Sequence, residues 1–187
     1  MHIGRYIAGA ALAAALPVFS LVSGNPRPDI TQYQTDHGQH GTDPAGGVID
    51  QVRKATAGFR DFKAVKDAEY TQFLGCVSSP QEGAMGIHFV NQKYVGDDEL
   101  DINKPEALIY EPYRGEYRLV GVEYIVMVDA WQAHHKEPPV LAGQTLQYQG
   151  SPNRYGLPAV YELHVWAWRD NPHGTFVDWN PRVACGG

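Results

Sequence analysis

The spacing of apolar residues changes once along the main part of the chain. Between residues 48 and 74, apolar side chains recur every three or four positions, with Lys, Arg, Asp and Glu between them: Val48, Val52, Ala55, Phe59, Phe62, Val65, Ala68 and Phe73. This is the period of an amphipathic helix. The pattern predicts two helices with a break near Arg60 and Asp61, and their apolar stripe must pack against another element.

From Cys76 onward the pattern is typical of strands. Short runs rich in Val, Ile, Tyr and Trp are bounded by Gly, Pro, Asn and Asp, and they predict strands at residues 85–90, 107–111, 117–128 and 160–169, with a weaker one near 144–148. Helices come first and strands follow without regular alternation. The sequence therefore predicts an α+β fold with two N-terminal helices packed on a curved, mostly antiparallel sheet.

The first 47 residues differ from the rest. Residues 1–24 carry one positive charge near the start, an apolar run over residues 6–19 and then the small residues Ser20, Ser23 and Gly24. The run is shorter than the roughly 20 residues that span a bilayer, so we interpret residues 1–24 as a signal peptide cleaved near Gly24 or Ser20. An uncleaved membrane anchor is the alternative. Residues 25–47 are polar and rich in Pro and Gly, and predict a flexible leader before a single domain at residues 48–187.

Charge narrows the range of partners. The chain has 15 Lys plus Arg and 21 Asp plus Glu, a net charge of −6, and loss of residues 1–24 would remove only Arg5 from this count. An acidic surface without a basic cluster argues against nucleic acid and against membrane binding after processing. We expect a secreted or periplasmic protein with a small-molecule ligand as its partner class. The oligomeric state is not predicted.

The two cysteines, Cys76 and Cys185, are an even pair in a chain that we expect to be exported. They predict one disulfide that ties the end of the chain to its middle. A pair of free thiols for metal or redox chemistry is the alternative, but there is no Cys-x-x-Cys motif.

The strand predicted at residues 117–128 contains a carboxylate in an apolar setting. Period-two alternation places Leu119, Gly121, Ile125 and Met127 on the face of Glu123, and the other face is also apolar. A buried carboxylate needs a proton, a hydrogen bond, a cation or a metal ion. Glu123 is therefore a candidate functional residue.

Histidines on two other predicted strands are candidate partners of Glu123. His88 lies between Ile87 and Phe89, and His164 shares a face with Glu162. If these strands adjoin, His88, Glu123 and His164 converge into a triad that can hold iron, zinc or copper and leaves coordination positions open. Glu162 would be a further ligand, a supporting contact or a base. In the alternative interpretation, the face of Glu162 and His164 is solvated, and that strand packs inward through its other face.

Aromatic residues near the C-terminus suggest a second kind of site. Trp166, Trp168 and Trp179, with Tyr155 and Tyr161, could line a pocket for a planar or sugar-like ligand, or could be ordinary core. Two functions remain open: a small exported metal-binding protein, with or without catalytic activity, and a non-catalytic module that binds a small ligand in an aromatic-lined pocket. The sequence does not decide whether the protein is an enzyme.

Four phrases together resemble a family of exported bacterial proteins of unassigned function. They are GCV at residues 75–77, MGIHFVN at 85–91, VGVEY at 120–124 and HVWAWRDNP at 164–172. The resemblance spans roughly residues 49–185, and it implies export and a shared fold. It implies no activity, cofactor or catalytic residue.

Overall fold

The structure, a computed structural model, describes residues 44–186. The predicted signal peptide, and the predicted leader up to residue 43, lie outside these residues. Helix α1 (Pro44–Thr56) begins inside the range predicted as leader, and it continues into a 3-10 turn, η2 (Ala57–Arg60), and a short helix α2 (Lys63–Asp67). The predicted break near Arg60 and Asp61 therefore separates the two helices. The second helix ends at Asp67 instead of reaching residue 74.

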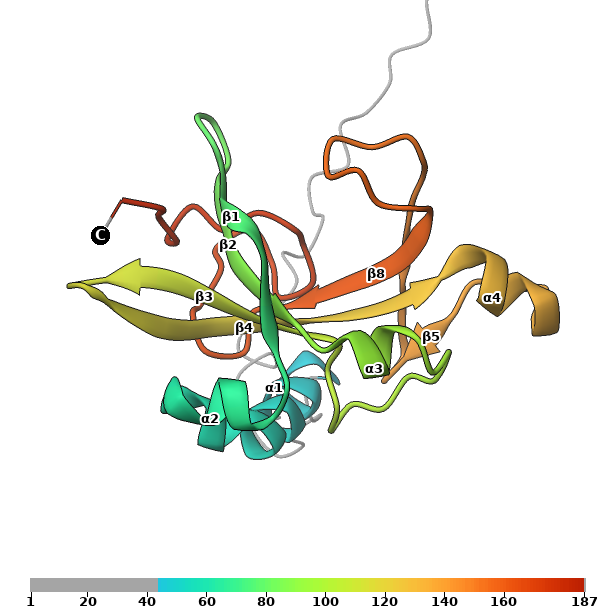
Figure 1. Cartoon of the computed structure of the whole chain (residues 1–187), viewed down its shortest axis with the longest axis horizontal. Coiled ribbons are helices and arrows are strands. Elements are labelled where there is room, and N and C mark those ends of the chain that lie inside the picture. Colours follow the sequence, from blue (N-terminus) through green and yellow to red (C-terminus); the bar gives the residue numbers. More distant parts are fainter. Residues whose placement is uncertain (1–43, 187) are drawn as a thin grey trace, which may run out of the picture. The chain divides into compact units, whose positions relative to one another are not determined.

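Six strands form one sheet in which all neighbours are antiparallel. The order across the sheet is β1 (Thr71–Ser79), β2 (Gly83–Val90), β3 (Ala107–Tyr113), β4 (Glu116–Met127), β8 (Val160–Val165) and β7 (Gln147–Gln149). The strands curl as they cross the helices (Figure 1). The prediction of an α+β fold with a curved antiparallel sheet is confirmed.

The remaining elements are short connections. Helix α3 (Gln92–Val95) follows β2, and helix α4 (Val128–His134) follows β4. Strands β5 (Val140–Leu141) and β6 (Gln144–Thr145) pair as a separate ribbon. The weak strand predicted near residues 144–148 is thus two strands in two sheets. No helix within residues 44–186 is long and apolar enough to cross a membrane.

One face of the sheet packs against α1 and α2. Val52 and Val65 are fully buried on the two helices, and the ring of Phe62 makes edge contacts with Phe89 at 5.0 Å and Tyr110 at 5.3 Å between centroids. The sheet contributes alternate residues to this core, as the period of a strand requires. The amphipathic stripe predicted from the sequence is therefore the helix side of the main core.

The opposite face of the sheet is covered by the C-terminal segment. Strand β8 ends at Val165, earlier than predicted, because the next residue leaves the sheet: the backbone N–H of Trp166 donates to the carbonyl of Thr175. Further along, Asn180 pairs with Ala84 as an isolated bridge. Trp166 and Val183 pack on Ile109 and Val120 in a second, smaller core. Both faces of the central strands are therefore buried.

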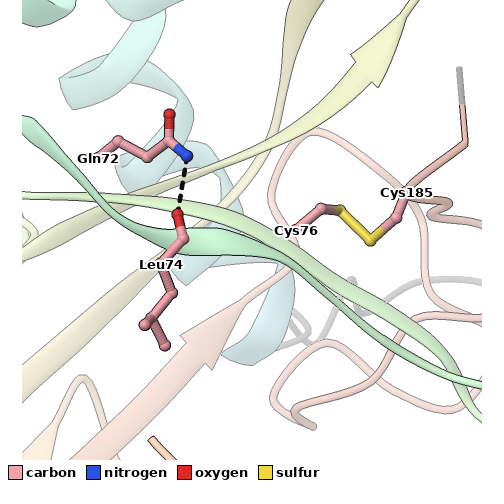
Figure 2. The surroundings of a disulfide bond; sticks show 4 residues. All are labelled: Gln72, Leu74, Cys76 and Cys185. Atoms are coloured by element: carbon pink, nitrogen blue, oxygen red, sulfur yellow. Dashed lines mark hydrogen bonds between the residues drawn. A yellow bond between two sulfur atoms is a disulfide. The ribbon is translucent and has the colours of Figure 1, made fainter.

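A disulfide between Cys76 and Cys185 joins strand β1 to this C-terminal segment (Figure 2). The predicted pairing is confirmed, and residues 44–186 contain no free cysteine. Strand β1 itself is irregular near Cys76. Its pairing with β2 shifts between Phe73 and Val77, Leu74 has a φ of +61°, and the Gln72 amide donates to the Leu74 carbonyl at 2.8 Å.

Candidate metal centre

His88, Glu123 and His164 lie on the same face of three strands of the sheet. Glu123 on β4 is directly opposite His164 on β8, and on its other side it is opposite Ala107 on β3. His88 on β2 is opposite Ile109 on β3. Ile109 is two residues after Ala107, so both point to the same face of β3. The small side chain of Ala107 leaves room above β3, so the side chains of His88 and Glu123 can meet across that strand.

The three side chains converge as the sequence predicts. Nε2 of His88 lies 3.3 Å from Nε2 of His164 and 3.5 Å from Oε2 of Glu123. Nδ1 of His164 lies 3.9 Å from Oε1 of Glu123. One ligand atom from each residue can be chosen so that all three lie within 4.8 Å of one another. This group could hold a metal ion.

The cluster is shielded from water. His164 is completely buried, and Glu123, Glu162 and His88 are no more than 9 % exposed. The interpretation of the Glu162 and His164 face as a solvated surface is therefore wrong. The face carrying Tyr161, Leu163 and Val165 is buried as well, because the C-terminal segment covers one side of β8 and the main core covers the other.

Burial changes the proton affinities of the cluster. Burial lowers the pKa of His88 to about 3, with a further contribution from His164, and burial lowers the pKa of His164 to about 4. Burial is the largest cause that raises the pKa of Glu123 well above its usual value, and the neighbouring Glu162 carboxyl raises it further. Both imidazoles are consequently neutral at pH 7, with lone pairs free to act as metal ligands.

Glu162 stands beside the triad, and its carboxyl neighbours that of Glu123. Burial raises the pKa of Glu162. Among the ion pairs of residues 44–186, none joins Glu123 or Glu162 to a lysine or an arginine. Two buried carboxyl groups are thus adjacent without a cationic side chain.

A third acidic residue, Asp178, was not singled out from the sequence. It lies in the C-terminal segment, and its Oδ1 is 3.6 Å from Nδ1 of His164. These two buried atoms have no hydrogen-bond partner. Burial also raises the pKa of Asp178. A polar atom that is buried without a partner is unusual and points to a missing contact.

A cavity of about 290 Å³ opens beside the cluster. His88, Glu123 and Glu162 form part of its wall, and most of the rest is apolar: Phe73, Leu74, Val77, Met85, Val90, Val95, Ile125, Met127, Leu157, Pro158 and Val160. The three polar groups are therefore reachable from one apolar space.

The structure does not bring Trp166, Trp168 and Trp179 together in one pocket. Trp166 is buried and donates its indole N–H to the carbonyl of Val177. Trp168 donates to Oγ1 of Thr56 on α1. Of the three, only Trp179 lines a hollow, a polar one that also has Asp178 and Tyr155 in its wall. Trp166 and Trp168 are core residues that anchor the chain after β8.

No protein-family model, no curated protein and no solved structure matches this chain. The resemblance to exported bacterial proteins stays a prediction from the quoted phrases.

Proposed function

We propose that this is an exported protein that binds one divalent metal ion through His88, Glu123 and His164. The observation that carries the proposal is the convergence of these three side chains, from three separate strands, at ligand-to-ligand distances of 3.3 and 3.5 Å. Two imidazoles and a carboxylate are a common ligand set for catalytic zinc and for non-haem iron, and they leave positions open for water or another molecule.

The distances are compatible with a tetrahedral zinc site. Ligands about 2.0 to 2.1 Å from an ion lie about 3.3 Å apart in a tetrahedron. The separations of His88 from His164 and from Glu123 agree with this value. The identity of the ion is left to the measurement below.

Charge also supports a cation at this place. Glu123 and Glu162 are buried next to each other, and Asp178 is nearby, without a lysine or arginine bonded to any of the three among residues 44–186. Ionising such buried carboxyl groups without a compensating cation is costly, and this cost is what raises their pKa values. A divalent ion would supply the positive charge that the described residues lack.

Asp178 fits a supporting role at the same site. If Nε2 of His164 binds the ion, its Nδ1 carries the proton and needs an acceptor, and Oδ1 of Asp178 lies 3.6 Å away. A carboxylate behind a metal-binding histidine fixes the ring and raises its basicity. The unpartnered Nδ1 and Oδ1 atoms are consistent with a contact that shortens slightly when the ion is bound.

Export is the second half of the proposal. The Cys76–Cys185 disulfide is typical of proteins that fold in an oxidising compartment. The signal-peptide pattern of residues 1–24 and the resemblance to exported bacterial proteins agree with it. We propose a secreted or periplasmic location.

Metal binding is tested with protein purified without an affinity tag. After dialysis against zinc, iron(II) or copper(II) and removal of excess ion, elemental analysis should find one ion per chain for at least one of the three metals. His88→Ala and Glu123→Gln should each lose most of this metal.

His134→Ala is the matched control, because His134 is an exposed histidine at the end of α4. It should bind metal as the wild type does. A wild-type protein that retains no ion, or a His88→Ala, Glu123→Gln double variant that retains a full equivalent with an unchanged circular dichroism spectrum, would refute the proposal.

A further inference from the structure

The wall of the cavity next to the cluster is mostly apolar and contains a few polar groups. Its buried polar side chains are those of His88, Glu123 and Glu162, and Gln92 and Tyr155 add polar groups from exposed or partly exposed positions. Apolar side chains from β1, β2, α3, β4 and the segment before β8 form the rest of the wall. We propose that the cavity binds a small, uncharged, mostly hydrocarbon molecule whose single hydroxyl or carbonyl group faces His88, Glu123 and Glu162. The proposal concerns the cavity of the metal-free chain, so it does not depend on whether the cluster binds an ion.

The size of the cavity limits the ligand. An apolar cavity of about 150 Å³ accommodates a molecule of six carbons, so about 290 Å³ accommodates on the order of ten non-hydrogen atoms. A sugar would fill this volume but would leave its hydroxyl groups against an apolar wall at a cost. An aliphatic alcohol or ketone of eight to ten heavy atoms satisfies both the volume and the wall, by the same order-of-magnitude argument.

The charges around the cavity select against an anion. The lining residues include no lysine and no arginine. Two of the polar groups that do line it, Glu123 and Glu162, are neighbouring carboxyl groups. A carboxylate ligand would therefore enter a low-dielectric space that already holds acidic groups. A hydroxyl or carbonyl group can form a hydrogen bond with the same residues without bringing a charge into this space.

The irregular part of β1 shapes the entrance. Consecutive residues of a regular strand point to opposite faces, yet Phe73 and Leu74 both line the cavity. The register shift after Phe73 and the left-handed backbone of Leu74 make this possible. Figure 2 shows the Gln72 amide bonded to the Leu74 carbonyl at this point. Leu74 is 47 % exposed, which is unusual for a large apolar side chain and suits a position at the mouth of a binding site.

The test measures binding of three eight-carbon probes to the full chain after treatment with EDTA: 1-octanol, octanoate and octylamine. Isothermal titration calorimetry should detect 1-octanol, and octanoate should bind at least about tenfold more weakly, because the cavity offers it no cation. Octylamine reports whether the carboxyl groups prefer a cation instead.

Two variants locate the binding site. Val95→Trp and Leu157→Trp place an indole in the cavity from partly exposed positions, and each should weaken 1-octanol binding at least about tenfold. Val140→Trp is the matched control, because Val140 is 58 % exposed and lies outside the cavity. It should bind 1-octanol as the wild type does.

Three outcomes would overturn the proposal: no binding of 1-octanol, binding of octanoate or octylamine as tight as that of 1-octanol, or unchanged binding in both cavity variants. All three are read in the absence of metal. They are therefore separate from the elemental analysis, and either proposal can fail while the other stands.

Discussion

At the scale of single residues, the site combines three side chains on strands with a carboxylate that lies outside them. His88, Glu123 and His164 each interrupt an apolar run, and a period of two places each on a defined face. Asp178 could not be found in this way. It lies outside the strands, and its position depends on distant contacts such as the bridge between Asn180 and Ala84. No local pattern carries that information.

Asp178→Asn tests the supporting role of this residue. The change keeps the shape of the side chain and removes its charge, so we expect metal affinity to fall about 10- to 100-fold with one ion still bound at saturation. The measurement is a competition titration against a zinc-binding dye.

Asp170→Asn is the control, because Asp170 lies in the same C-terminal segment and its side chain is exposed in a surface ion pair with Arg182. It should leave zinc affinity unchanged. If Asp178→Asn binds zinc as tightly as the wild type does, Asp178 does not act on the site.

Glu106 allows a separate prediction about pH. It is 1 % exposed, its Oε2 accepts a hydrogen bond from the backbone N–H of Ile125, and burial raises its pKa to about 8 from 4.5. Between pH 4.5 and pH 8, the Glu106 carboxyl therefore keeps its proton in the folded chain, whereas it has lost this proton in the unfolded chain. The contribution of Glu106 to the free energy of unfolding is fully present below pH 4.5 and is lost as the pH rises through 8.

Comparison with Glu106→Gln isolates this effect from the other titrating groups. We expect the free energy of unfolding of the wild type, relative to the variant, to fall by a few kcal/mol between about pH 5 and pH 8. Urea unfolding at a series of pH values measures it. A difference between the two proteins that does not change with pH would show that Glu106 titrates normally.

At the scale of elements, four of the six strands of the sheet were predictable because β2, β3, β4 and β8 are rich in β-branched and aromatic residues. Strand β1 was not predicted. Its residues are half-exposed without alternation, since the register shift near Leu74 breaks the period of two. The same segment continued the three- to four-residue spacing of the helices, and this explains why the second helix was predicted to be too long.

The disulfide links the irregular strand β1 to the segment that carries Asp178. Its two cysteines are 109 residues apart, so opening it frees a long loop in the unfolded chain. We expect Cys76→Ser combined with Cys185→Ser to lower the free energy of unfolding by up to about 4 to 5 kcal/mol. Denaturant unfolding at fixed pH measures this loss.

Reduction of the wild type with dithiothreitol should cause the same loss and should leave the double serine variant unaffected. A loss below about 1 kcal/mol in both experiments would mean that residual contacts in the unfolded chain already hold these segments together.

At the scale of the molecule, the site depends on which strands become neighbours. The chain between β4 and β8 includes α4, the β5–β6 ribbon and β7, and β8 then returns to pair with β4. The register of this return could not be predicted from the sequence, so convergence of the three side chains was a conditional prediction. The sheet order fulfils the condition, and the covering C-terminal segment makes the cluster buried.

The central claim is that His88, Glu123 and His164 bind one ion together, and X-ray absorption spectroscopy of the zinc-loaded protein tests it most directly. The account predicts two imidazole nitrogens and at least one oxygen at about 2.0 to 2.2 Å from the zinc, with no sulfur, since both cysteines are in the disulfide. A spectrum without imidazole scattering, or one that requires sulfur ligands, would contradict the account.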